Sequence, residues 1–114
     1  MGRERDSILG AQSELLAAAW LMELGYEVFR NVSPCGPADL IAWKRGTLDK
    51  HLIDVKTVNN IYKRADGIET PNVPAAHPDG VHYLVVSGGQ VLGFYKREDN
   101  RAGSVAYWPF GPSL

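Results

Sequence analysis

The first strong pattern in the chain is helical. Apolar side chains recur at steps of three and four residues between Ser7 and Leu24, which is the spacing of one helix face. The positions in this stripe are Ile8, Ala11, Leu15, Ala18, Ala19 and Met22, thickened by Ala17, Trp20 and Leu21. Asp6 or Ser7 is suited to cap the start, and Gly25 to end the helix in a left-handed conformation. The pattern predicts a buried helix over Ser7–Leu24.

The rest of the chain has the pattern of short strands. Alternating or continuous apolar runs occur in Tyr26–Val32, Ala38–Trp43, Lys50–Val58, Val81–Ser87, Gln90–Lys96 and Ser104–Trp108. Ser33–Pro37 breaks the first of these runs. Lys44–Asp49 has the length of a hairpin loop, so the segments on either side of it should pair antiparallel, and Gly88–Gly89 fits a two-residue hairpin turn. Helix and strands together predict an α/β fold.

The segment Asn59–Gly80 has no clear pattern. It contains Pro71, Pro74 and Pro78 among several Asn, Asp and Gly residues, so we expect a loop with at most one helical turn near Ala75–His77. A loop of this length is unusual in a small domain. It indicates either a substrate-facing excursion or a helix that the pattern does not reveal.

Composition limits the class of protein. The chain has 114 residues, of which 45% are hydrophobic and 22% charged, and this usage excludes a disordered or fibrous chain. We expect one domain over residues 1–114. No apolar run approaches the roughly 20 residues of a membrane span, and the charged start is unlike a signal peptide, so we expect a soluble, intracellular and cytoplasmic protein. A single cysteine, Cys35, forms no internal disulfide and shares no zinc-ligand spacing with the histidines.

Charge is unevenly distributed along the chain. The net charge is −1, which does not by itself indicate a polyanionic partner. Between Lys44 and Arg64, however, six bases accompany two acids. A solvated lysine-rich face is one explanation of this surplus, and a surface that contacts phosphates is the other.

Two acids stand inside apolar strands. An ionised carboxylate there is costly to desolvate unless it faces water or a cation. Side chains two apart in a strand share a face, so Asp54 and Lys56 emerge together while Ile53 and Val55 point to the core. Asp39 lies on the partner strand across the hairpin, so the three polar groups are expected to converge. They predict a metal site with a lysine beside it.

This set of residues fits phosphodiester chemistry. Mg²⁺ prefers one or two carboxylates with water and phosphate oxygens, and a lysine beside it would orient water or stabilise developing charge. Glu14, which interrupts the apolar helix, would complete the site through water or a second metal. Simpler explanations remain open at this stage: Asp54 and Lys56 as a surface ion pair, Asp39 as a turn cap, and Glu14 as a solvent-facing helix residue.

The order of these motifs resembles the PD-(D/E)xK nuclease superfamily. The matching features are a helix with a glutamate, then P-A-D at Pro37–Asp39, then D-V-K at Asp54–Lys56. Within the superfamily, Gly10–Thr57 is most similar to the archaeal Holliday-junction-resolvase-like branch and its small relatives. The helix that usually follows the catalytic strand is not visible in the sequence, and the chain is less basic than resolvases proper, so junction specificity does not follow.

The resemblance implies a restriction-endonuclease-like core, a central mixed sheet flanked by helices. It implies Mg²⁺-dependent cleavage of DNA, with Mn²⁺ able to substitute, and a homodimer. By position, Asp39 and Asp54 would be metal ligands, the Val55 carbonyl an additional ligand, Lys56 the catalytic lysine and Glu14 the helix glutamate that acts with them. Residues that would contact nucleic acid are Ser33, Lys44, Arg45, Thr57, Lys63 and Arg64.

The resulting hypothesis is a Mg²⁺-dependent endodeoxyribonuclease, with branched or junction DNA as a candidate substrate and no membrane partner. Two alternatives remain. One is a DNA-binding or assembly module that keeps the fold without turnover, and the other is a phosphodiesterase that acts on RNA.

Overall fold

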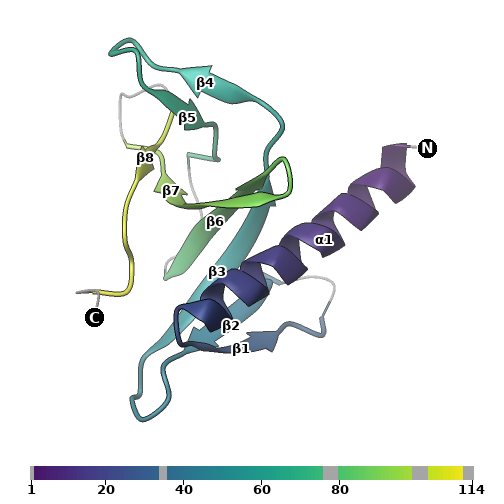
Figure 1. The fold of residues 1–114 in the computed structure, drawn as a ribbon, viewed down its shortest axis with the longest axis vertical. Helices are drawn as coiled ribbons and strands as arrows, with labels where there is room; N and C mark the ends of the chain where they lie inside the picture. The colour runs from purple at the N-terminus through teal and green to yellow at the C-terminus, as the bar shows by residue number, and fades with distance from the viewer. Residues whose placement is uncertain (1, 34–35, 76–79, 99–102, 112–114) are drawn as a thin grey trace.

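A mixed six-stranded sheet with one helix across it forms the body of the protein. The computed structural model describes residues 2–33, 36–75, 80–98 and 103–111. In the sheet, strands run in the order β1-β2-β3-β6-β7-β8, and all neighbours are antiparallel except β3 and β6. The elements of this layer are α1 (Gly2–Glu23), β1 (Glu27–Arg30), β2 (Leu40–Trp43), β3 (Lys50–Thr57), β6 (Val81–Ser87), β7 (Gln90–Lys96) and β8 (Val105–Ala106). The predicted α/β class and the mixed sheet of a restriction-endonuclease-like core are confirmed (Figure 1).

The segment 59–80 is long because it connects two parallel neighbouring strands, β3 and β6. Parallel neighbours need a crossover of a dozen or more residues, because the chain must return to the end at which the first strand began. Within this crossover lies a hairpin of β4 (Ile61–Lys63) and β5 (Glu69–Pro71), which pair antiparallel as a separate small sheet. The prediction of a structureless loop was therefore wrong at these strands. The turn expected near Ala75–His77 lies largely outside the described residues.

The ends of α1 differ in how well the sequence predicted them. The helix ends at Glu23, and Gly25 follows with φ of 97°, so the expected left-handed stop is confirmed. The helix begins at Gly2, one turn or more before the expected start. Asp6 and Ser7 therefore lie inside the helix, and the prediction that either one caps it was wrong.

The face that α1 turns to the sheet also differs from the prediction. Among helix residues 7–23, the buried positions are Ser13, Ala17 and Leu21. The predicted stripe includes Ala17 and Leu21, which are confirmed, but its members Ile8, Leu15 and Met22 are more than half exposed. The helix is apolar on most of its circumference, so periodicity alone could not select the buried side. The small Ala17 side chain lets the helix backbone lie close to the sheet.

Two apolar cores lie on opposite faces of the sheet. The larger one joins α1 to the sheet, and its buried members are Ala17, Leu21, Leu40, Ala42, Ile53, Leu84 and Phe94. Aromatic rings from the C-terminal segment close it, since Phe110 and Trp108 lie 5.0 and 6.0 Å from the Phe94 ring centroid. The smaller core contains Val73, Tyr83 and Val85. Val73, from the crossover, thus covers part of the face opposite α1.

Both predicted hairpins are confirmed. β2 pairs with β3 across residues 44–49, and Gly88 and Gly89 form the turn between β6 and β7. β6 and β7 have the predicted bounds. The other strands of this sheet are shorter than the apolar runs, most clearly β1 and β8. Within the described residues, no helix is both long and apolar enough to cross a membrane.

Candidate functional site

The first acid of the predicted site is fixed where β2 begins. The Asp39 backbone N–H donates to the Ile53 carbonyl at 2.8 Å, and its carboxylate Oδ2 accepts from the Val55 N–H at 2.8 Å. The last regular strand pair is Leu40 opposite Ile53, so the side chain takes over the hydrogen bonding where the backbone ladder stops. This bond holds the Asp39 carboxylate in one place beside β3.

The second acid lies next to the first. Asp54 points away from the α1 side of β3, since its neighbour Ile53 is fully buried in the larger core. Burial raises the pKa of Asp54, and the nearby Asp39 carboxylate raises it further by charge repulsion and by a side-chain hydrogen bond. The Lys56 ammonium, with Nζ 3.4 Å from Asp54 Oδ2, acts in the opposite direction. Asp39, Asp54 and Lys56 therefore form one charged cluster, as the strand pattern predicted.

The lysine of the cluster is held on two sides. Its Nζ lies 3.4 Å from Asp54 Oδ2 and 5.4 Å from the centroid of the Tyr83 ring. Tyr83 lies opposite Asp54 in the parallel β3–β6 pair and is buried. A cation over an aromatic face is attracted by the ring's negative face. Burial, opposed by Lys56, raises the pKa of the Tyr83 phenol, so the ring stays neutral. The sequence pattern did not predict this contact.

Glu14 approaches the cluster from α1. Burial raises the pKa of its carboxyl, and the charge of Asp39 is the next largest cause. On its other side, Arg30 Nε lies 3.8 Å from Glu14 Oε1. The Asp39 charge therefore acts on Glu14, and Arg30 is its cationic partner. Within the described part of the chain, no set of three or more His, Cys, Asp or Glu side chains is arranged to hold a metal ion. Asp39 and Asp54 share a side-chain hydrogen bond, whereas Glu14 is related to them through the charge of Asp39, so Glu14 lies at the margin of the site.

Asn31 fixes the segment that carries the first acid. Its side-chain Nδ2 donates to the Ala38 carbonyl at 2.8 Å, and its backbone N–H donates to the Asp39 carbonyl at 2.8 Å. Its Oδ1 also accepts from the Ser33 N–H at 2.8 Å. These bonds tie both ends of the connection between β1 and β2. An asparagine directly after a strand was the available sequence signal, since this side chain often bonds to nearby backbone.

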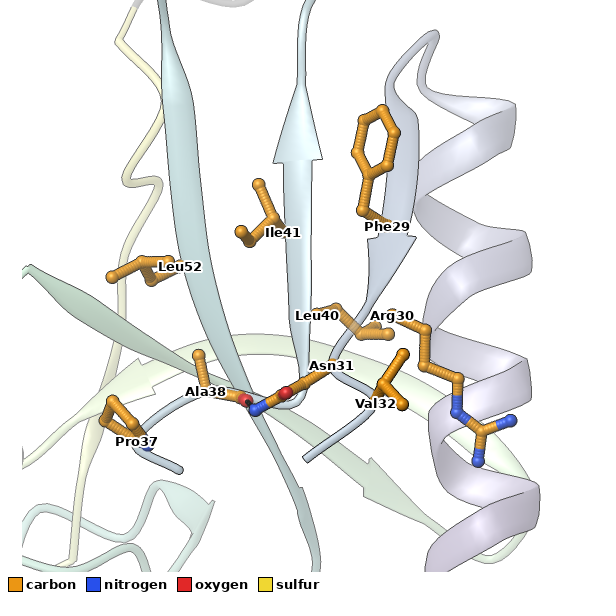
Figure 2. A pocket seen from close by; sticks show the side chains of 9 residues that line it. All are labelled: Phe29, Arg30, Asn31, Val32, Pro37, Ala38, Leu40, Ile41 and Leu52. Carbon is orange, nitrogen blue, oxygen red and sulfur yellow. Dashed lines mark hydrogen bonds between the residues drawn. The ribbon is translucent and has the colours of Figure 1, made fainter. Parts of the chain in front are cut away.

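An open groove is lined by residues of β1, β2 and β3 and of the connection between β1 and β2. It has a volume of about 360 Å³, and its lining residues are Phe29, Arg30, Asn31, Val32, Pro37, Ala38, Leu40, Ile41 and Leu52. Phe29, Ile41 and Leu52 project from three neighbouring strands in Figure 2. Ala38 and Leu40 flank Asp39 in sequence, and Leu52 shares its strand face with Asp54. The groove therefore borders the segment that carries Asp39, and none of the three cluster side chains is among its lining residues.

The predicted nucleic-acid contacts do not all lie near the cluster. Lys44 and Arg45 follow the far end of β2, which pairs with Lys50, and Arg45 forms an ion pair with Glu27. Lys63 is exposed on β4, in the hairpin that follows β3. The remaining basic candidate, Arg64, bonds through its guanidinium to the Asp66 carboxylate and the Ser104 carbonyl.

Ser33 and Thr57, the two uncharged residues predicted to contact nucleic acid, both form hydrogen bonds within the protein. The Ser33 N–H donates to Asn31, as described above, and Thr57 Oγ1 donates to Ser13 Oγ at 2.7 Å. The second bond links the end of β3 to α1. Thr57 therefore helps to hold the helix that carries Glu14.

Comparison with known proteins gives one informative relative. The chain is 44% identical over 82 residues to a UPF0102 protein of Caulobacter sp. (strain K31). The matched part is 70% of this chain but 58% of the relative, so the chain spans less than two-thirds of that protein's length. No family model and no solved structure matches the chain. The relative's name states no activity, so the function has to be argued from the cluster itself.

Proposed function

We propose that this protein is a Mg²⁺-dependent nuclease of the PD-(D/E)xK type that hydrolyses phosphodiester bonds in DNA. The observation that carries the proposal is the charged cluster of Asp39, Asp54 and Lys56, held at the junction of β2 and β3 by the Val55 N–H and the Tyr83 ring. Its order in the sequence, after a helix with Glu14, is the order of that superfamily.

The two carboxylates fit a divalent cation. They lie close enough for the charge of Asp39 to raise the pKa of Asp54, and a cation between them would remove this repulsion. Mg²⁺ usually takes one or two carboxylates together with water and substrate phosphate, so a third acid is not required. The Val55 carbonyl is proposed as a further ligand from the family resemblance. When bound, the ion would stabilise charge on the phosphate and make bound water more acidic.

Each side chain of the cluster has a proposed task. Asp39 and Asp54 would hold the ion, and the hydrogen bond from Val55 keeps Asp39 from rotating away. Lys56 would donate hydrogen bonds to the attacking water or to the phosphate oxygens as negative charge develops there. Its position between Asp54 and Tyr83 orients the ammonium before substrate binds. Glu14 would act through water, because it belongs to the margin of the site.

The open groove and the β4–β5 hairpin would receive the substrate. The groove adjoins Asp39, so a nucleotide next to the cleaved phosphate would lie on Phe29, Ile41 and Leu52. Lys63 on the exposed hairpin is suited to contact a phosphate, which positions a strand without reading its sequence. Ser33, Lys44, Arg45, Thr57 and Arg64 remain proposed secondary contacts. We further propose that the enzyme prefers branched or junction DNA.

The test is cleavage of a supercoiled plasmid and of a four-way junction in Mg²⁺ and in Mn²⁺. We expect Asp54→Asn and Lys56→Met to lose at least about 100-fold in rate, the usual contribution of such groups. The matched controls are Asp49→Asn and Lys50→Met, an acid and a lysine that are exposed at the other end of the hairpin. These controls should keep the wild-type rate.

Three results would contradict parts of the proposal. Equal cleavage by wild type and Asp54→Asn would remove the cluster from the chemistry. DNA binding without cleavage in either metal, and without Mn²⁺ binding by calorimetry, would support a module without turnover. Faster cleavage of RNA than of DNA of the same sequence would make the protein a ribonuclease.

A further inference from the structure

A row of three apolar side chains crosses β1, β2 and β3 on the face of the sheet opposite α1. Phe29 pairs with Ile41, and Ile41 pairs with Leu52, in the antiparallel register, so the three side chains are lateral neighbours on one face. Their strand neighbours Ala42 and Ile53 belong to the core under α1, which places the row on the other side. Phe29 is 53% exposed and projects from the edge strand β1 (Figure 2). We call these three side chains the apolar row.

The apolar row lies beside the charged cluster along the strands. Leu52 and Asp54 are two residues apart on β3, so their side chains share a face and lie about 7 Å apart along the strand. Asp39, which shares a side-chain hydrogen bond with Asp54, precedes Ile41 by two residues. A single sugar spans a similar separation between a base and its phosphate. A base on the row therefore belongs to the nucleotide whose phosphate lies at the cluster or to the next one, and this step rests on the proposed function.

The charge of the groove around the row suits a nucleotide. Among the described residues that line the groove, Arg30 is the one base and none is an acid. The Arg30 side chain is 61% exposed, and its Nε lies 3.8 Å from Glu14 Oε1, so its guanidinium can contact a phosphate from the solvent side. A nucleotide combines a flat apolar base with a phosphate, and the groove offers an apolar surface with a cation at its rim. An apolar protein segment would leave this cation without a use.

The accessible side of Phe29 limits the form of the nucleic acid. In a duplex each base is stacked between its neighbours, so a protein surface meets only base edges, sugars and phosphates. In a single strand the base faces are open, and they stack on aromatic side chains. Aromatic rings on open sheet faces bind unpaired bases in this way in other folds. A half-exposed ring on a sheet therefore fits an unpaired base and offers little to a duplex.

We propose that the apolar row binds an unpaired base of DNA, with Phe29 as the ring on which the base stacks. The substrate then contains single-stranded DNA at or beside the cleaved bond. Among branched substrates, this favours a flap or a splayed arm over a four-way junction, in which the bases at the centre are paired.

The first test is binding of a short single strand that carries the fluorescent base 2-aminopurine, with Ca²⁺ in place of Mg²⁺ so that binding is measured apart from cleavage. Wild type should quench the probe and bind the single strand at least about 10-fold more tightly than the blunt duplex of the same sequence. Phe29→Ala should weaken single-strand binding by roughly 5- to 150-fold, the usual effect of removing one stacking ring. Its binding to the duplex should not change.

Matched variants separate stacking from general apolar contact. Phe29→Trp keeps a ring and should bind like wild type, whereas Phe29→Leu keeps only an apolar side chain and should behave like Phe29→Ala. Leu48→Ala changes a 95% exposed leucine in the β2–β3 turn and should bind both forms of DNA like wild type. Circular dichroism would verify that all variants are folded.

A second measurement locates the base. A single strand that contains 5-iododeoxyuridine, irradiated when bound, should form a cross-link that mass spectrometry assigns to Phe29. Equal single-strand binding by wild type and Phe29→Ala, tighter binding of the duplex, or cross-links confined to the β4–β5 hairpin would overturn the proposal.

The two proposals fail in different ways. Single-strand binding that depends on Phe29, without cleavage in Mg²⁺, would keep the apolar row as a binding site and remove the nuclease activity. Cleavage that depends on Asp54 but is the same in Phe29→Ala, on flap and four-way junction alike, would keep the nuclease and remove the row from substrate binding.

Discussion

The two faces of β3 have opposite roles. On the α1 side, Ile53 is fully buried and Val55 packs against the larger core. On the other side, Asp54 and Lys56 lie beside Asp39, and burial together with the Asp39 charge raises the pKa of Asp54. One face of an eight-residue strand thus stabilises the fold, while the other holds charges in a position that costs stability. The charged face is the one on which the proposed function depends.

The largest effect on stability is expected from the apolar face. Ile53→Ala removes a fully buried side chain between helix and sheet, and such truncations cost about 2–5 kcal/mol. Urea unfolding followed by circular dichroism measures this loss. Leu48→Ala, at an exposed turn, is the control and should change stability by less than about 0.5 kcal/mol. A loss of less than about 0.5 kcal/mol for Ile53→Ala would contradict the stabilising role of the apolar face.

A smaller effect is expected where the apolar face ends. Thr57→Val removes the hydroxyl that donates to the buried Ser13 at 2.7 Å, and a hydrogen bond of this type contributes about 0.5–1.5 kcal/mol. The double variant with Ser13→Ala should recover part of the loss, because no buried hydroxyl is then left without its partner. A double-mutant cycle gives the coupling. Strictly additive single losses would show that the bond does not link β3 to α1.

On the charged face, removing a charge should not destabilise the protein. Burial and the Asp39 charge raise the pKa of Asp54 in the folded state, so the folded protein binds this proton more tightly than the unfolded chain does. Stability from Asp54 is then present at low pH and is lost as pH rises from the usual range of aspartate through the raised pKa. Asp54→Asn keeps the side chain neutral and escapes this loss.

The check is the urea midpoint of wild type and Asp54→Asn in the presence of a chelator. The midpoint of the variant should equal or exceed that of wild type at pH 7, and the difference should shrink toward pH 3. A variant that is clearly less stable than wild type at pH 7 would show that the ion pair with Lys56 outweighs the burial of Asp54.

The smallest effect on stability is expected from His51, near the start of β3. The His51 ring lies 4.3 Å from the Phe110 ring centroid, and burial lowers the pKa of His51. Its stabilising contribution is therefore complete above the ordinary histidine pKa and is lost as pH falls through the lowered value. His51→Phe should be less sensitive than wild type to a change from pH 7.5 to 5. Thermal unfolding at several pH values measures this, and parallel curves for both proteins would contradict it.

Local patterns predicted the parts of the fold that local chemistry determines. Gly88 and Gly89 form the expected hairpin turn, and Gly25 ends the helix as expected. Alternation along β3 separated Ile53 from Asp54 correctly, because successive side chains in a strand always point to opposite faces. The convergence of Asp39 with Asp54 also followed from pattern, since a hairpin of known length connects their strands.

The sequence pattern failed to predict the structure where more than one arrangement fitted the same spacing of apolar residues. Both faces of α1 are apolar, and the predicted stripe combined the exposed Leu15 with Ala17 and Leu21, which the structure buries. In the crossover, prolines and polar residues concealed β4 and β5, whose three-residue strands are stabilised mainly by pairing with each other. The Tyr83 contact with Lys56 was hidden because it joins strands that are distant in sequence.

The sequence alone therefore determined the alternation of strands, the turns and the set of charged residues that the strands carry, because each depends on neighbours a few residues away. The tertiary structure decided which side of α1 is covered, how Asn31 and the Val55 N–H hold Asp39, and which aromatic ring supports Lys56. The first two depend on how side chains pack and bond once the elements meet, and the third depends on the parallel pairing of β3 with β6, across a crossover whose path no local pattern specifies.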